Sequence, residues 1–511
     1  MSPEPLRADS LEQAGVSDNQ SHPARRVPLA QAIGVVGVLL LAGSSVSVGV
    51  VPAAADPGAI PVLGGITELP VLGLAAALVG MGLVVTAWLL LATVLIPHPD
   101  AVSPRRIAAT LVLWAAPLLV VPPLFSDDVY SYLAQGAVAD RGFDPYVGGP
   151  ADFLAADDPL LRNVSGYWER SAAPYGPLFL LIAQLIARIA ATDVLAGIAL
   201  HRVVELAGLA LVLWALPALA RRAGVSAART LWLGVLNPLV LFHLIAGIHN
   251  DALMLGLMLA GTELALRGLD RDRLGYLPLV AGVGLIGTAA SVKLPAAAAL
   301  AVVVVGFTHR WNGGPITFVR SVTVTIVLFG SVIAAFSLAS GFGFGWVAGL
   351  TTPGEVNSWL APTNQAGFLA GGIGMLFGVS ITQAAIGIGK IIGALVAVVL
   401  GIVVLRRMLD RTVEPVAGLG LLFAVAIVFG PVVQPWYLLW CVLPLSAVVL
   451  RTRWLWVLTW LSAVLAVIVP PLGSGIHGDV LGIALGYAIA FGLLATVIML
   501  GRSLRIASPV A

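Results

Sequence analysis

The sequence contains few charged residues. Only 10% of its 511 residues are charged, whereas soluble domains carry about a quarter charged residues. Hydrophobic residues make up 59%, and the mean hydropathy is +1.01. This composition excludes a soluble globular protein, so we expect a protein embedded in a membrane.

Cysteine and lysine are almost absent. The single cysteine, Cys441, lies in an apolar run, which excludes disulfides and thiolate metal sites within one chain and suits a small buried hydrophobic residue. The two lysines are Lys293 and Lys390, so nearly all of the 27 basic residues are arginine. These are scattered and the formal net charge is +2, so nucleic acid is not an expected partner.

Long apolar runs are what the sequence does contain. Runs of about 17 to 25 residues recur from about residue 28 to residue 500, and each can cross a hydrocarbon layer of about 30 Å as a helix. Helices are expected because backbone polar groups in lipid must be satisfied within their own segment. We predict an all-α polytopic membrane protein with about 14 transmembrane helices, within a range of roughly 13 to 16.

The predicted domain organisation is simple. Residues 1–27 are polar and lack apolar periodicity, which predicts a disordered cytoplasmic leader. The first apolar run is too long for a signal peptide and follows this leader, so it is interpreted as a retained span. Residues 28–505 form one transmembrane domain with a large outer loop at 125–175, and residues 506–511 form a tail.

The arginines predict the topology. Short loops rich in basic residues mark the cytoplasmic face, and the loops between them are acidic or neutral, which places both termini in the cytoplasm. The segments 176–219 and 366–405 each hold two apolar runs but must cross an odd number of times. One helix in each is therefore expected to be short, broken or re-entrant.

Two adjacent carboxylates, Asp127 and Asp128, begin the large outer loop. Adjacent carboxylates raise each other's pKa unless a cation or hydrogen-bond donors offset the repulsion, and a carboxylate so placed suits a general base. The alternative is that Asp127 only caps a helix and Asp128 faces water.

The residues that follow have helical spacing. Tyr132, Gln135 and Ala139 fall on one face, which predicts an amphipathic helix lying on the outer leaflet and ending near Gly142.

Further polar side chains interrupt apolar segments. His249, Asn250 and Asp251 lie between two apolar runs, where polar groups are functional candidates; helix capping by Asn250 or Asp251 is the alternative. No second His or Cys stands at zinc-ligand spacing, so no metal is expected. Lys293 could engage a phosphate as a point charge, or its side chain could extend to the membrane interface.

Aromatic residues stand at the outer end of a late span. Gln434, Trp436 and Tyr437 occur in the run QPWY. They could anchor the chain at the interface, or the rings could stack against a sugar or an isoprenoid. Tyr175, in PYGP, allows the same two interpretations, anchoring at the interface or stacking on a sugar or isoprenoid.

Two charged residues fall inside one predicted membrane helix. Arg202 and Glu205 are three positions apart, so they can face and neutralise each other.

Several of these segments together resemble a known family. In order they read FSDDVYSYLAQG, GFDPY, APYGPL, HNDALMLGL, SVKLP and QPWYLLW. Their order and spacing resemble the polyprenol-phosphate-mannose-dependent α-1,6-mannosyltransferases of actinobacteria, the MptA/MptB type and closer to MptB, within the GT-C glycosyltransferase superfamily. The resemblance covers about residue 28 to residue 500.

The resemblance implies a GT-C-type bundle and an enzyme. It implies metal-independent, inverting transfer of mannose from polyprenyl-phosphate mannose to a lipid-anchored mannan acceptor, which builds the α-1,6-linked backbone of lipomannan and lipoarabinomannan. The family places its presumed base at the start of the first large outer loop, which is Asp128 here, with Asp127 beside it. The expected substrate-binding or phosphate-binding residues are Tyr132, Tyr175, His249, Asn250, Asp251, Lys293, Gln434, Trp436 and Tyr437, and Arg141 or Arg170 could assist.

The expected partners are the lipid-linked donor, the mannan acceptor and membrane lipids. No cofactor is expected, and no nucleotide-binding glycine-rich loop is found. The expected location is the plasma membrane, with an extracytoplasmic active site. A lipid or sugar transporter or flippase is the main alternative, since many broken spans would suit one, but such a protein should show paired halves and charges near the bilayer midplane. A noncatalytic assembly subunit is a third reading.

Overall fold

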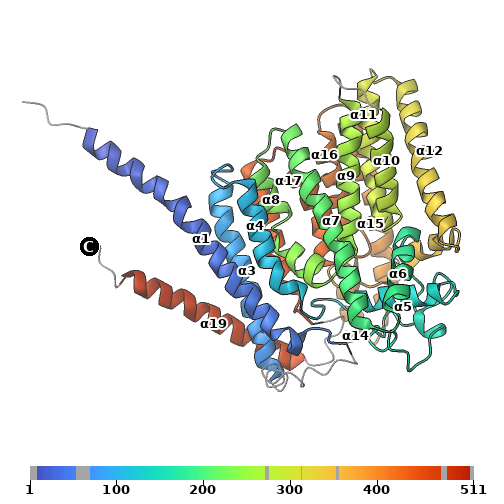
Figure 1. The fold of residues 1–511 in the computed structure, drawn as a ribbon, viewed down its shortest axis with the longest axis horizontal. Helices are drawn as coiled ribbons and strands as arrows, with labels where there is room; N and C mark the ends of the chain where they lie inside the picture. The colour runs from blue at the N-terminus through green and yellow to red at the C-terminus, as the bar shows by residue number, and fades with distance from the viewer. Residues whose placement is uncertain are drawn as a thin grey trace, which may run out of the picture.

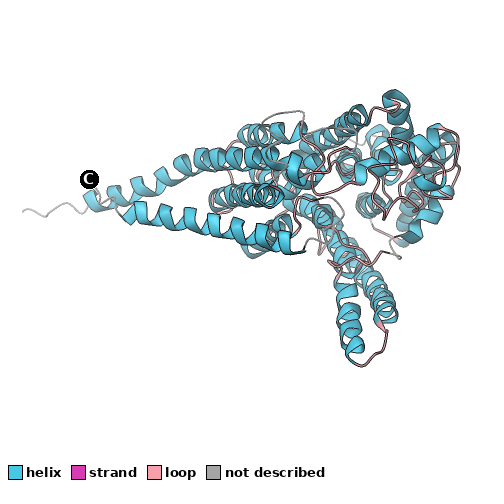
Figure 2. Cartoon of the chain, turned by 90° about the horizontal axis from the view of Figure 1, so that it is seen from below, coloured by secondary structure: helices cyan, strands magenta, loops and turns pink. Residues whose placement is uncertain are grey.

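The chain is built from helices. The computed structural model describes residues 9–52, 69–270, 276–311, 313–352, 356–472 and 480–506, and over these residues it contains helices and loops but no strand (Figure 2). The all-helical fold predicted from the sequence is therefore confirmed.

The helices are numbered as in Figure 1. The α-helices are α1 (Asp9–Val48), α3 (Pro70–Leu95), α4 (Pro104–Ala115), α5 (Asp128–Asp140), α6 (Pro177–Ala190), α7 (Val194–Arg222), α8 (Ala227–Gly234), α9 (Asp251–Leu269), α10 (Tyr276–Ala290), α11 (Leu300–Arg310), α12 (Pro315–Ala339), α14 (Pro362–Leu376), α15 (Thr382–Leu409), α16 (Pro415–Phe429), α17 (Leu438–Ser446), α18 (Thr452–Ile468) and α19 (Val480–Ile506). Short 3-10 helices are η2 (Ala116–Leu119), η3 (Pro150–Asp152), η5 (Leu294–Ala299), η6 (Gly345–Thr351) and η7 (Pro435–Tyr437), and η4 (Val240–Ala246) is a π-helix.

Among the residues that the structure describes, six segments are long and apolar enough to cross a membrane: Arg25–Val48 within α1, and helices α3, α7, α9, α12 and α15. Shorter apolar helices accompany them. The chain is a polytopic membrane protein, as predicted, whereas the number of crossings stays a prediction.

Each of the two segments that must cross the membrane an odd number of times, 176–219 and 366–405, contains one short helix. Helix α6 has 14 residues and α14 has 15, so they extend over about 21 and 23 Å, less than the roughly 30 Å of the hydrocarbon layer. Their neighbours α7 and α15 have 29 and 28 residues. The expectation of a short helix in each segment is confirmed, and re-entry stays a prediction.

Helices α1, α3 and α19 lie together at one side of the molecule (Figure 1). Glycine allows α1 and α3 to approach closely, since a Cβ atom at Gly37 would lie 2.7 Å from the carbonyl oxygen of Gly80. Helix α1 begins at Asp9, inside the segment predicted to be disordered. Adding a residue to an established helix costs far less free energy than nucleating a new helix. The polar leader can therefore continue the helix of the first span.

The centre of the molecule is formed by α8, η4 and the start of α9. Residues 230–252 are buried throughout. Trp232 of α8 and Trp88 of α3 stack at 5.1 Å and each donates its indole N–H to the other's backbone carbonyl, at 3.1 and 3.0 Å. These contacts fix the segment that leads to His249.

Helix α5 forms where the sequence predicted it, but it does not lie on the surface. Every residue from Val129 to Ala139 is buried, so the predicted amphipathic helix, exposed on one face, is wrong. The helix packs against α6, where a Cβ atom at Gly136 would lie 2.2 Å from the carbonyl oxygen of Ala183. It ends at the expected place, before Gly142 with φ +83°.

Candidate active site

Asp128 occupies the first position of α5. Its backbone N–H donates to the hydroxyl of Ser126 at 3.1 Å, and its carboxylate Oδ2 lies 3.3 Å from Nδ1 of His249. The Asp128 side chain is 17% exposed, whereas that of His249 is 1% exposed. Asp128 is therefore the accessible member of a carboxylate–imidazole pair.

The donors around Asp128 determine its pKa. Burial raises the pKa, but the hydrogen bond and charge of His249 and the charge of Lys293 outweigh burial and leave the pKa below 3.8. Donors thus offset the repulsion expected for adjacent carboxylates. Asp127 is buried and makes no capping hydrogen bond, so the alternative of a capping Asp127 beside a water-facing Asp128 is wrong.

His249 is held from behind by an aromatic ring. Its imidazole stacks on the indole of Trp436 with ring centroids 3.6 Å apart, and its Nε2 atom has no hydrogen-bond partner among the residues described. The preceding Ile248 has φ +54°, a rare conformation for a β-branched residue, and Phe125, three residues before Asp128, has φ +67°. Strain of this kind gathers at functional sites, and here it accompanies both members of the pair.

Asp251 follows His249 by two residues and is buried to 1% exposure. Its Oδ2 accepts hydrogen bonds from Nζ of Lys293 at 2.8 Å and from the indole of Trp436 at 3.0 Å, and Oδ1 accepts from the indole of Trp440 at 2.7 Å. Both oxygens are therefore used within the protein. Asp251 fixes Trp436, which supports His249.

Asn250 was expected either to bind substrate or to cap α9. It precedes that helix but makes no capping hydrogen bond, so capping by Asn250 is not what the structure shows. Among the described residues, neither its amide nitrogen nor its amide oxygen has a hydrogen-bond partner, and both are buried. Such groups are unfavourable unless something satisfies them, which makes Asn250 a candidate for binding a ligand.

Lys293 pairs with Asp251 instead of extending to water. Its ammonium also lies 5.0 and 5.7 Å from the ring centroids of Tyr437 and Trp440, which stack on each other at 4.1 Å. An ammonium has three donors, and the Asp251 carboxylate takes one of them.

The remaining predicted residues lie at different distances from the pair. Tyr132 and Tyr175 are buried in an aromatic cluster, edge to face at 5.2 Å. Burial raises the pKa of both phenols, and the charge of Asp128 raises it further. Gln434 is half-buried at the start of η7 and makes no capping hydrogen bond there.

The arginines suggested for phosphate binding form ion pairs with aspartates of the same outer loop. Arg141 pairs with Asp158 at 2.6 Å and Arg170 with Asp152 at 3.5 Å. Neither contact reaches the pair of Asp128 and His249.

The predicted neutralisation of Arg202 by Glu205 is wrong. Arg202 donates to the backbone carbonyls of Leu119 and Val121, while Glu205 accepts from the backbone N–H of Leu253 at 3.1 Å. A spacing of three residues allows two side chains to meet, but the guanidinium donates instead to carbonyls at and after the end of η2.

Ser126 and Trp440 were not singled out from the sequence. Trp440 stands four residues after Trp436, a spacing that puts both indoles on one helical face and could have identified it. Ser126 precedes the carboxylate pair by one residue and carries no comparable signal.

The carboxylate of Asp128, which is partly exposed and paired with the imidazole of His249, can accept a proton. A lysine and an unsatisfied amide nearby can donate to an anion. Within the described ranges, no three His, Cys, Asp or Glu side chains come together as a metal site.

Comparison with known proteins decides the family. Residues 31–309 match the family described as "Alpha-(1->6)-mannopyranosyltransferase, N-terminal domain", and residues 362–500 match the "MptB C-terminal domain". The chain belongs to this mannosyltransferase family. The resemblance stated on the sequence motifs, including the likeness to MptB, is confirmed, and with it the class of enzyme.

Individual relatives agree. A protein of Mycolicibacterium smegmatis named "Probable alpha-(1->6)-mannopyranosyltransferase" is 39% identical over 81% of this chain and 78% of its own length. An alpha-(1->6)-mannopyranosyltransferase of Mycobacterium tuberculosis is 35% identical over 81% and 77%. The alpha-(1->6)-mannopyranosyltransferase B of Corynebacterium glutamicum is 33% identical over 93% and 82%. No solved structure matches the chain.

Proposed function

We propose that this membrane protein transfers mannose from polyprenyl-phosphate mannose to a lipid-anchored mannan acceptor, with inversion at the anomeric carbon, and so forms α-1,6 linkages of a lipomannan backbone. The names of its relatives support the sugar and the linkage. The arginine-rich loops support an active site on the outer face of the plasma membrane.

The observation that carries the proposal is the pair formed by Asp128 and His249. Asp128 accepts the proton of the acceptor's 6-hydroxyl as that oxygen attacks C1 of the donor mannose. The bond between C1 and the phosphate oxygen breaks, and a β-linked donor yields an α-linked product. The imidazole of His249 orients the Asp128 carboxylate and stabilises its negative charge. Asp128 therefore stays ionised before the acceptor hydroxyl binds.

The leaving group is a polyprenyl phosphate and needs donors. Lys293 can direct its remaining ammonium hydrogens toward the phosphate, and the amide of Asn250 can supply a further hydrogen bond. Because Asp251 balances the charge of Lys293, the phosphate is bound by directed hydrogen bonds more than by excess positive charge. Trp436 stacks on His249, and Tyr437 lies beside the Lys293 ammonium, so these two rings position the groups that meet the substrate.

The experiment is reconstitution of the full-length chain in liposomes with polyprenyl-phosphate [14C]mannose and an α-1,6-mannoside acceptor. We expect one polyprenyl phosphate released for each mannose transferred, an α-1,6 bond by NMR, and a rate unchanged by EDTA. Transfer from a nucleotide-linked mannose but not from the lipid donor would overturn the proposed donor, and a product with retained β configuration would overturn inversion.

A further inference from the structure

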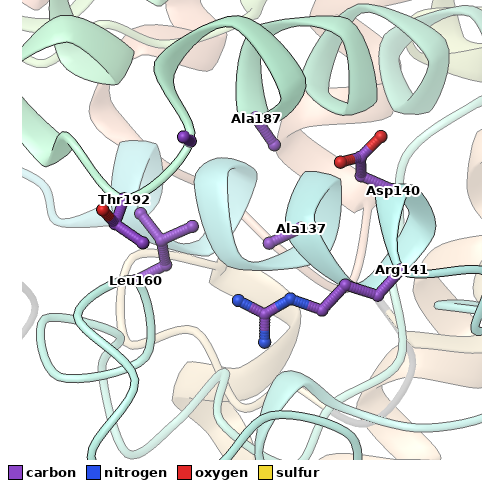
Figure 3. Close-up of a pocket in the computed structure, with 7 residues that line it drawn as sticks. Ala137, Asp140, Arg141, Leu160, Ala187 and Thr192 are labelled. Carbon is purple, nitrogen blue, oxygen red and sulfur yellow. The ribbon is translucent and has the colours of Figure 1, made fainter.

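A small pocket lies at the far end of the catalytic helix. Its walls come from the C-terminal end of α5, the end of α6 and the loop that carries Leu160, and its volume is about 200 Å³ (Figure 3). The lining residues are Ala137, Asp140, Arg141, Leu160, Ala187, Ala191 and Thr192. None of them takes part in the site around Asp128.

The two helices that line the pocket pack closely against each other. Helices α5 and α6 meet at Gly136, where a Cβ atom would lie 2.2 Å from the carbonyl oxygen of Ala183, so the two walls cannot slide apart without losing this contact. Ala191 in the wall has φ +50°, an unfavourable conformation for a residue with a side chain that tends to persist at functional sites.

Charge balance around the pocket favours a neutral, polar ligand. Asp140 pairs with Arg188 at 2.8 Å, and Arg141 pairs with Asp158 at 2.6 Å, so two carboxylates oppose two guanidinium groups. The Asp140 carboxylate would repel a phosphate that Arg141 attracts. A sugar hydroxyl both donates and accepts, so it can satisfy both kinds of group.

The size and place of the pocket narrow the ligand further. Its volume is below the range of roughly 300 to 1,000 Å³ that holds drug-sized molecules, which suits a single sugar ring against the small side chains of Ala137 and Ala187. Along α5, Ala137 lies about 14 Å and Arg141 about 20 Å from Asp128. That distance exceeds one or two pyranose rings, so only an acceptor of several linked sugars reaches both places.

We infer that this pocket is a subsite for a mannosyl unit of the acceptor chain, several units away from the hydroxyl that reacts. The inference rests on the proposed function, because it takes the acceptor to be a mannan. It makes the enzyme prefer long acceptors, since a short acceptor fills the reacting position alone.

Filling the pocket tests the inference. Thr192→Trp places a large ring at an exposed lining position, and Arg141→Gln removes a donor from the wall. We expect the ratio of kcat/KM for an acceptor of four or more mannoses to that for a single mannoside to fall about fivefold to tenfold in each, which corresponds to one or two sugar hydrogen bonds. The matched controls are Ala156→Trp and Arg162→Gln, at exposed positions outside the pocket, and both should keep the wild-type ratio. A wild-type ratio in Thr192→Trp, or equal losses on both acceptors, would overturn the subsite.

Direct binding separates this inference from the proposed function. An α-1,6-linked mannotetraose titrated into the purified full-length chain should bind without donor and protect residues 137–141 from hydrogen exchange. Thr192→Trp should abolish that protection. If the chain transfers no mannose but binds the tetraose in this way, the subsite stands while the proposed function fails. If the tetraose protects no part of the pocket, the subsite is wrong.

Discussion

Substituting Asp251 with asparagine keeps the size of a buried side chain but removes the charge that holds three donors. The ammonium of Lys293 and the indoles of Trp436 and Trp440 would then face an amide. The amide oxygen of asparagine can accept a hydrogen bond from one or two of these donors. The amide NH₂ group is itself a donor, so it leaves the remaining donor without an acceptor.

The magnitude follows from burial. Removal of one partner from a buried ion pair costs about 3 to 5 kcal/mol, and the lower end applies because the Lys293 side chain is 18% exposed. Loss of one indole hydrogen bond adds about 1 kcal/mol. We expect Asp251→Asn to lower the free energy of unfolding by roughly 4 kcal/mol.

The double variant makes the reasoning testable. Asp251→Asn with Lys293→Met removes the orphaned ammonium and should recover about 2 to 3 kcal/mol relative to the single variant, because a whole buried pair can be replaced at little cost. Unfolding of the full-length chain in mixed micelles, followed by tryptophan fluorescence, measures all four members of the cycle. Additive effects of the two substitutions would refute the coupling of Asp251 to Lys293.

Three further outcomes are expected. Because the donors around Asp128 lower its folded pKa, the stability that its ionised carboxylate contributes is present at neutral pH and is lost only as the pH falls through that lowered pKa. His249→Asn should raise this pKa and so move the acid limb of the transfer rate to higher pH, and an unmoved limb would count against the pair. Gly136→Ala should destabilise the chain by about 3 kcal/mol through its clash with α6, while Gly166→Ala, which meets no atom within 4 Å, should be neutral in the same unfolding assay. Trp88→Phe should cost about 1 to 3 kcal/mol by removing one of two reciprocal hydrogen bonds, and a loss no larger than that of an exposed Trp454→Phe would contradict this.

The membrane character and the short helices follow from the sequence because they depend on local properties. The length of an apolar run and the sign of the loop charges bear directly on whether and how a segment meets lipid. The burial of α5 does not follow, because periodicity describes one helix by itself, and Tyr132 and Gln135 are covered by partners distant in the sequence, such as α6.

The candidate site was predicted as separate pieces. Asp128, His249, Lys293 and Trp436 were each identified because polar or aromatic groups interrupt an apolar sequence. The family resemblance implied that they share one site, but nothing in the spacing places Asp128 against a histidine more than a hundred residues away. Nor does spacing reveal that Asp251 accepts hydrogen bonds from Lys293, Trp436 and Trp440 through both oxygens.

The most direct measurement compares kcat for mannosyl transfer in Asp128→Asn and Asp127→Asn, with both variants shown to be folded. If Asp128 is the base, its variant should lose about 10² to 10⁴ in kcat, while Asp127→Asn keeps most of the wild-type rate. Near-normal transfer by Asp128→Asn, or a larger loss in Asp127→Asn, would contradict the assignment of Asp128 as the group that takes the proton.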